Sequence, residues 1–211
     1  MVDDYRYTEY CEPYKDLASE KGKVVALFKQ LHPKAWDMHT YISNNDGPLK
    51  DAFLAAYNHK CAYCGVSIDI ISKQAFEVDH FIHRKDSRFK TKAAAGYIEN
   101  LVLSCHRCNH AKGDLVIPDS AHGYLHPDKQ GIKTTFVRDD DYYIRIAEER
   151  KTDPIVNLFY RRLDLENDVH RLDYLLLSMR GLRQKIGESN PAQKHLADAI
   201  DLLQKKRNLI G

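Results

Sequence analysis

The sequence has no run of about 18 apolar residues, the length that a membrane-spanning helix needs. Its first 16 residues lack the order of basic and then apolar residues that is typical of a signal peptide. It also has no low-complexity tract and no internal repeat. We therefore expect a cytoplasmic protein with no membrane contact, made of ordinary globular structure.

A strong net charge is missing as well. The formal net charge is +2, so the total charge does not predict a nucleic-acid-binding protein. The distribution is less even, because residues 84–92 carry an excess of four positive charges. Such a segment can contact a phosphate backbone, or it can be an ordinary solvated loop, and both interpretations remain open.

Helical periodicity dominates the two ends of the chain. Apolar residues spaced three, four and seven apart predict an amphipathic helix over residues 16–32. Turn residues at 45–48 then precede a short helix predicted over residues 49–58. Helices return from residue 153, with an apolar stripe over residues 169–186 and a last helix over residues 193–208.

Strand signals occupy the middle of the chain. Residues 75–79 and 101–104 are short and rich in β-formers, and a helix is predicted from Cys105 to a stop at Gly113. Residues 133–148 alternate on both sides of an acidic turn, which predicts a hairpin. The fold class is therefore α+β, and we divide the chain into a helical region (1–58), a cysteine-rich core (59–118), a hairpin and connecting segment (119–152) and a helical region (153–211).

Cysteine is scarce, with five residues, yet four of them form two Cys-x-x-Cys pairs separated by forty residues. Cys61, Cys64, Cys105 and Cys108 offer the four thiolates of a closed, structural zinc site. In a reducing compartment such pairs are more often metal ligands than disulfides, although degenerate or redox cysteines are the alternative. We expect Cys11 to be a free thiol with no role.

The residues around these pairs resemble the HNH, or ββα-metal, endonucleases. The matching stretches are "VDH" (78–80), "ENL" (99–101) and "CHRCNHAKG" (105–113), in the family's order. The resemblance covers about fifty residues, from Cys61 to Gly113. It implies a zinc-stapled ββα-metal (HNH) nuclease core, which here would be embedded in a mainly helical frame.

The resemblance also implies a role for each matching residue. His80 would be the general base, which suits a group that titrates near neutrality. Asp79 and Asn109 would bind a catalytic Mg²⁺ or Mn²⁺, ions that prefer hard oxygen ligands. Asn100 would order the loop that orients His80, and Lys112 would contact phosphate.

Some assignments have alternatives. The third family position is often a histidine directly after the last cysteine, and here it is Asn109, so His110 is a reserve ligand. His83 is a second candidate base or a phosphate contact, together with Arg84, Lys85 and Arg88. Glu77 should share the strand face of Asp79 and support it.

We therefore expect a metal-dependent endonuclease, with DNA favoured as the substrate. The alternatives are an RNA (such as tRNA) nuclease, a non-catalytic zinc-stapled nucleic-acid-binding module, and a redox or metal-sensing protein. The segment after residue 153, with "LDLEND" at 163–168, is similar to the nuclease subunits of bacterial antiphage systems of the Septu and retron-associated type. That similarity implies a larger ATPase partner docked on the helical flanks.

Overall fold

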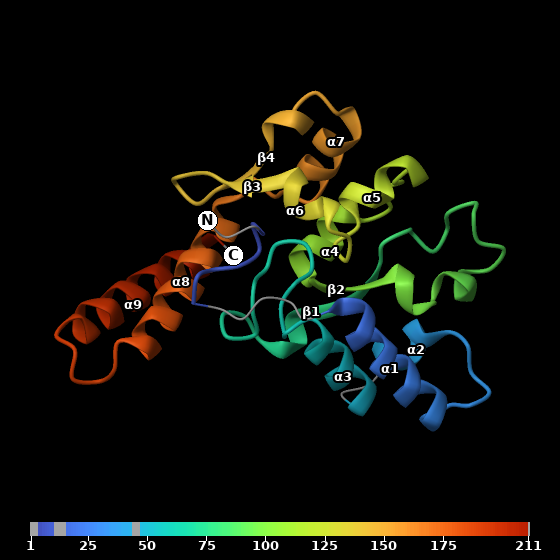
Figure 1. Cartoon of the computed structure of the whole chain (residues 1–211), viewed down its shortest axis with the longest axis horizontal. Coiled ribbons are helices and arrows are strands. Elements are labelled where there is room, and N and C mark those ends of the chain that lie inside the picture. Colours follow the sequence, from blue (N-terminus) through green and yellow to red (C-terminus); the bar gives the residue numbers. More distant parts are fainter. Residues whose placement is uncertain (1–3, 11–15, 44–46, 211) are drawn as a thin grey trace.

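The computed structural model describes residues 4–10, 16–43 and 47–210 of the chain (Figure 1). The helices are α1 (Leu17–Leu31), α2 (Met38–Ser43), α3 (Pro48–Ala56), α4 (His106–Lys112), α5 (His122–Leu125), α6 (Gly131–Thr135), α7 (Pro154–Arg162), α8 (Asp168–Lys185) and α9 (Ala192–Ile210). The strands are β1 (Phe76–His80), β2 (Leu101–Cys105), β3 (Phe136–Arg138) and β4 (Ile144–Ile146). Within the described ranges, none of the helices combines the length and the apolar character needed to cross a membrane.

The helices predicted before residue 60 are present. Asp16 caps α1 by accepting a hydrogen bond from the backbone N–H of Ala18 at 3.1 Å. The apolar stripe of α1 buries Val24 and Phe28, and α1 packs against α3. The predicted turn at 45–48 lies largely outside the described residues, which resume at residue 47.

The two predicted central strands pair as an antiparallel hairpin, and α4 follows directly from β2. Val78 lies opposite Leu103, and Asp79 lies opposite Val102. All five residues of β2 are buried. This explains why apolar and polar residues do not alternate along its sequence. The helix ends at Gly113, whose φ of 53° is in the region that favours glycine.

The hairpin predicted over residues 133–148 is shorter than expected. Residues 133–135 belong to α6, and β3 begins at Phe136. The Thr135 hydroxyl oxygen lies 2.8 Å from the carbonyl oxygens of both Gly131 and Tyr124 and can donate its proton to either, which holds the helical turn in place of an extended strand. The predicted strand start was therefore wrong by three residues.

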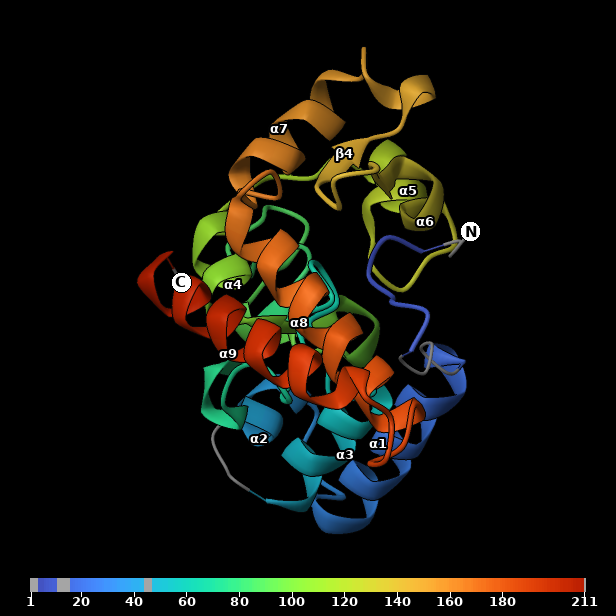
Figure 2. The same ribbon diagram turned by 90° about the vertical axis from the view of Figure 1, so that its left-hand side faces the viewer.

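One apolar cluster joins most of the molecule. It contains Tyr5, Phe28, Phe53, Leu103 and Phe159, which come from the N-terminal segment, α1, α3, β2 and α7. The long helices α8 and α9 form an antiparallel pair, which lies at the left side of the molecule in Figure 1 and across the front in Figure 2. The division of the chain into four regions stays a prediction.

The α8–α9 pair is anchored at the central hairpin. Arg107, in the first turn of α4, donates to the carbonyl oxygen of Ile210 at 3.1 Å. The predicted apolar stripe buries Val169, Leu172 and Leu176 inside the chain. On α9, however, Leu202 and Leu209 are 70% and 86% exposed.

Candidate active site

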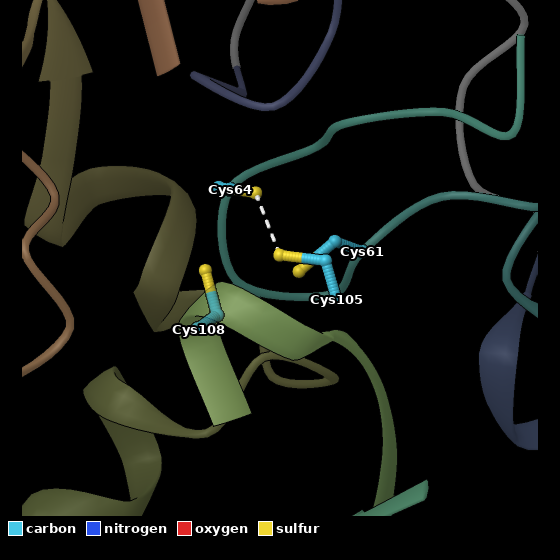
Figure 3. A group of neighbouring side chains, drawn as sticks. All are labelled: Cys61, Cys64, Cys105 and Cys108. Atoms are coloured by element: carbon cyan, nitrogen blue, oxygen red, sulfur yellow. Dashed lines mark hydrogen bonds between the residues drawn. The ribbon is translucent and has the colours of Figure 1, made fainter. Parts of the chain in front are cut away.

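Four buried cysteines converge at the start of α4. Cys61 and Cys64 lie on the turn before β1, Cys105 ends β2, and Cys108 lies in the first turn of α4. Their sulfur atoms lie within 4.8 Å of one another, with Cys64 Sγ and Cys105 Sγ 3.9 Å apart, and point toward a common centre (Figure 3). Cys11 lies outside the described residues.

The donor set fits a tetrahedral metal ion. Zinc lies about 2.3 Å from thiolate sulfur, so the sulfurs of a tetrahedral site are about 3.8 Å apart. The observed separations require little movement to reach that geometry. Because four sulfurs would fill the coordination sphere, an ion held here would join the 61–64 turn to α4 and leave no position for substrate.

The N-terminal segment supports the first cysteine turn, which the sequence did not predict. The Tyr5 hydroxyl donates to the Tyr63 carbonyl oxygen at 2.5 Å, and the Arg6 guanidinium donates to the Ala62 carbonyl oxygen at 2.8 Å. Gly65 has φ of 81°, and a Cβ there would lie 2.5 Å from the backbone oxygen of Arg6. The turn therefore requires glycine on both counts.

Asp79 lies on the face of β1 that meets α4. Its carboxylate accepts hydrogen bonds from the Tyr63 hydroxyl at 2.6 Å and from Lys112 Nζ at 3.0 Å. The Lys112 ammonium also donates to the His80 carbonyl oxygen at 2.8 Å. Burial raises the pKa of Asp79, while Lys112 and Tyr63 act in the opposite direction.

This arrangement differs from two roles expected from the sequence. Lys112 is fully buried and paired with Asp79, so it does not offer its charge to a phosphate. The Asp79 carboxylate is 7% exposed, with both oxygens bound and an ammonium beside it. Asp79 as placed does not fit a ligand of Mg²⁺ or Mn²⁺, because the Lys112 charge would repel the ion.

Replacing Lys112 with methionine should lower the free energy of unfolding by about 3–5 kcal/mol, since breaking a buried ion pair leaves an uncompensated charge. Urea unfolding of the purified variant measures this. Adding Asp79→Asn to Lys112→Met should recover part of the loss, because the remaining side chain is then neutral.

Lys151→Met is the matched control for that experiment. The pair of Lys151 with Glu148 is exposed on both sides, at 56% and 81%. Its loss should change the free energy of unfolding by about 1 kcal/mol or less. Equal effects of Lys112→Met and Lys151→Met would contradict a structural role for the buried pair.

His80 ends β1 and lies on the opposite face of the strand from Asp79. Its ring stacks on the ring of His39 from α2, with the centroids 4.1 Å apart and the planes at 30°. His39 Nε2 is 3.2 Å from the Val78 carbonyl oxygen, which positions this second ring against β1. His39 was not predicted as a site residue.

Asn100 fixes the chain that leaves His80. Its side-chain Oδ1 accepts from the Ile82 backbone N–H at 2.8 Å, and its Nδ2 donates to the carbonyl oxygens of Ile82 and Ala95 at 3.0 and 2.9 Å. The amide side chain is therefore fully engaged and 1% exposed. This geometry is the one expected of a residue that orders the loop after His80.

The His80 imidazole is neutral over most of the accessible pH range. Burial, together with the neighbouring positive charges of His39 and Arg84, lowers its pKa to about 3. Among the described residues its ring nitrogens have no hydrogen-bond partner, and they are not sealed from solvent. This pKa is lower than the near-neutral value expected from the sequence, so His80 is a weaker proton acceptor than expected, but its unpartnered ring nitrogens reach solvent and stay deprotonated at neutral pH.

Asn109 and His110 lie near a different carboxylate. The Asn109 side-chain amide donates to Glu77 Oε2, and His106 Nδ1 is 2.7 Å from Glu77 Oε1. The ring of His110 lies beside that of His106, with the centroids 3.9 Å apart. The structure thus groups Asn109 and His110 with Glu77, whereas Asp79 is paired with Lys112.

Some basic side chains of the predicted loop form ion pairs within the protein, and others are exposed to solvent. Arg88 forms two hydrogen bonds of 2.8 Å with Asp86, contacts Asp119 and donates to the Ile117 carbonyl oxygen, so its expected phosphate contact is replaced by internal pairing. Arg84 and Lys85 are exposed, and His83 is half-buried. Exposed positive charge therefore remains at Arg84 and Lys85, and also at Lys90 and Lys92.

The sequence did not predict two residues that contact the site, His39 and Tyr63. His39 lies outside the cysteine-rich segment, and nothing in its local sequence marks it. Tyr63 lies between the first two cysteines, a position where a buried hydroxyl near the Asp79 strand could have been suspected.

Comparison with known proteins gives one positive result. The chain matches no curated protein and no solved structure. Residues 61–115 match the family model described as HNH endonuclease, and this span runs from the first cysteine through β1, β2 and α4. Residues 61–115 are therefore similar to HNH endonuclease domains.

Proposed function

We propose that this protein is an endonuclease that hydrolyses phosphodiester bonds in DNA, with His80 as general base and zinc held by the four cysteines. The observation that carries the proposal is the environment of His80. Its ring is neutral, reaches solvent and is positioned by Asn100 and His39 at the end of β1. The HNH family match and the order β1, β2, α4 support a ββα-metal core around it.

The chemistry expected of His80 is proton abstraction from water. A ring nitrogen takes a proton, the oxygen of that water attacks phosphorus, and the bond to the leaving oxygen breaks with its electron pair on that oxygen. The exposed Arg84 and Lys85 follow His80 closely in the chain and provide positive charge for the phosphate.

A catalytic Mg²⁺ or Mn²⁺, as the HNH resemblance implies, would supply charge stabilisation for the leaving oxygen. The expected ligands do not fit it as placed, because Asp79 is paired with Lys112 and the Asn109 amide is bonded to Glu77. What the chain itself contributes is the base, its orientation and the neighbouring positive charge.

The low pKa of His80 sets an expectation for the pH dependence of cleavage. A base that stays neutral down to a pKa of about 3 places the acidic limb of the kcat/KM profile well below pH 6.5, provided the protein stays folded. His39→Ala should raise the pKa of His80, because it removes both burial and a neighbouring positive charge. The acidic limb of the kcat/KM profile should therefore move toward pH 6.5. His39→Phe, which keeps a stacked ring, should shift the limb less.

Measurement of kcat/KM between pH 4 and pH 8 for the three proteins checks this expectation, with circular dichroism confirming the fold at each pH. Superimposable profiles for wild type and His39→Ala would show that His39 does not tune the base.

The proposed substrate is tested by comparing supercoiled plasmid, single-stranded DNA and a folded RNA such as tRNA under one buffer with Mg²⁺ or Mn²⁺. We expect nicking and linearisation of the plasmid at a higher rate than cleavage of RNA. Faster RNA cleavage would favour the RNA-nuclease alternative, and binding without cleavage of any substrate would favour the non-catalytic module.

The antiphage role, the ATPase partner and the cytoplasmic location stay predictions. The exposed Leu202 and Leu209 on α9 are the place to test the partner, because their replacement by serine should not disturb the core. Loss of a co-purifying ATPase from the Leu202→Ser, Leu209→Ser double variant, with a normal melting temperature, is the expected result. Recovery of no partner with the wild-type protein from its native host would contradict the prediction.

A further inference from the structure

A second group of metal-binding side chains lies where β1 meets α4. Glu77, His106 and His110 each offer one ligand atom, and these atoms lie within 4.8 Å of one another. His106 Nδ1 is 2.7 Å from Glu77 Oε1, and the two imidazole rings lie side by side. Both histidines are exposed and Glu77 is half-buried, so an ion can reach the group from solvent.

We propose that Glu77, His106 and His110 bind a transition-metal ion of the Zn²⁺ class, with the remaining coordination position open to solvent. Two imidazoles and one carboxylate are a ligand set that suits Zn²⁺ and its neighbours in the first transition row, whereas Mg²⁺ prefers oxygen ligands alone. Ligand atoms about 2.0–2.2 Å from a tetrahedral ion are about 3.3–3.6 Å apart, so small side-chain rotations would bring the three atoms into range.

The backbone holds the three ligands in place before any ion binds. His106 and His110 are four residues apart on α4 and therefore share one face of the helix. The helix begins directly after Cys105, so the cysteine site fixes where the first histidine lies. Glu77 comes from the paired strand β1, opposite Ser104 of β2.

Asn109 orients the proposed ligand Glu77 and does not itself bind the ion. Its side-chain amide donates to Glu77 Oε2, which leaves Oε1 directed at His106. Hydrogen bonds of this kind orient ligating carboxylates in metal sites. Asn109 would then act through Glu77, as a positioning residue, in place of the direct ligand role expected from the sequence.

The proposed site is distinct from the other candidate positions in the domain. The cysteine group is buried and its four sulfurs leave no open position, whereas this group faces solvent. Asp79 is paired with Lys112 and does not contribute. An ion with an open position can bind water or a phosphate oxygen, but the inference concerns metal binding and holds whether or not the protein cleaves nucleic acid.

Zinc binding to the full-length protein tests the proposal. Protein with its cysteine site loaded is titrated calorimetrically with Zn²⁺, and bound zinc is counted by mass spectrometry after dialysis against buffered zinc. We expect wild type to take up a second zinc per chain. Glu77→Gln, His106→Ala and His110→Ala should each weaken the second zinc by at least about tenfold while the first is retained.

His195→Ala is the matched control, because His195 is an exposed histidine on α9, outside this group. It should leave both zinc ions in place. A wild-type protein that stops at one zinc would overturn the proposal, and so would a second zinc whose affinity is unchanged in all three site variants. Circular dichroism and the retained first zinc show that each variant is folded, so neither result can be attributed to misfolding.

Discussion

Cys105→Ser should yield protein that has lost its zinc and its cooperative fold. Structural zinc contributes about 10–16 kcal/mol to the folding of small zinc domains, which is as large as the total stability of about 5–15 kcal/mol of a typical protein. Removing one ligand also leaves three buried thiols beside the apolar cluster that joins α1, α3 and β2. We therefore expect low solubility, zinc below one atom per chain and no melting transition by circular dichroism.

Cys11→Ser is the matched control for the same preparation. Because Cys11 has no predicted role, this variant should keep zinc, solubility and a wild-type melting temperature. A Cys105→Ser protein that melts cooperatively at the wild-type temperature would show that no metal holds this turn to α4.

His80→Ala should reduce the single-turnover cleavage rate by about 10²–10⁴-fold, the range that general-base catalysis contributes. The His80 ring has no hydrogen-bond partner among the described residues, so its main structural contact is the stack on His39. Zinc content should stay at the wild-type value, and the melting temperature should fall by a few degrees at most.

His83→Ala is the matched control, because His83 lies three residues after His80, in the loop that follows β1, and is half-buried. It should weaken substrate binding modestly and leave the rate at saturation nearly unchanged. Retained activity in His80→Ala together with lost activity in His83→Ala would transfer the role of base to His83.

Local sequence patterns predicted the elements that carry the site. The β-branched and apolar residues around Val78 and Leu103 specify strands, and Gly113 specifies the end of α4. The cysteine spacing predicted a convergent set of sulfurs, and the structure brings them together. Asn100 hydrogen-bonds the loop after His80, and its role in ordering that loop was implied by the HNH resemblance and not by a local pattern.

The features that the sequence did not predict depend on contacts between side chains that are far apart in the chain. Lys112 reads as a solvent-facing helix residue, yet it is buried because Asp79, thirty-three positions earlier, faces it across the β1–α4 contact. Arg88 is paired locally with Asp86, two residues earlier, and Asp119 from a distant segment adds a second contact. His39 joins the site from α2, and its contact with His80 depends on how α2 packs against β1. Each case includes a tertiary contact that local patterns do not encode.

The most direct test of the central claim, that this chain is an HNH nuclease acting through His80, is plasmid cleavage followed across a gel-filtration peak. Wild-type and His80→Ala proteins are purified in parallel, and each fraction is assayed for zinc and for conversion of supercoiled plasmid to nicked and linear forms. We predict that cleavage and zinc coincide with the wild-type peak, whereas the His80→Ala peak contains zinc and no cleavage. Cleavage that does not follow the protein peak, or that is equal in the two proteins, would contradict the claim.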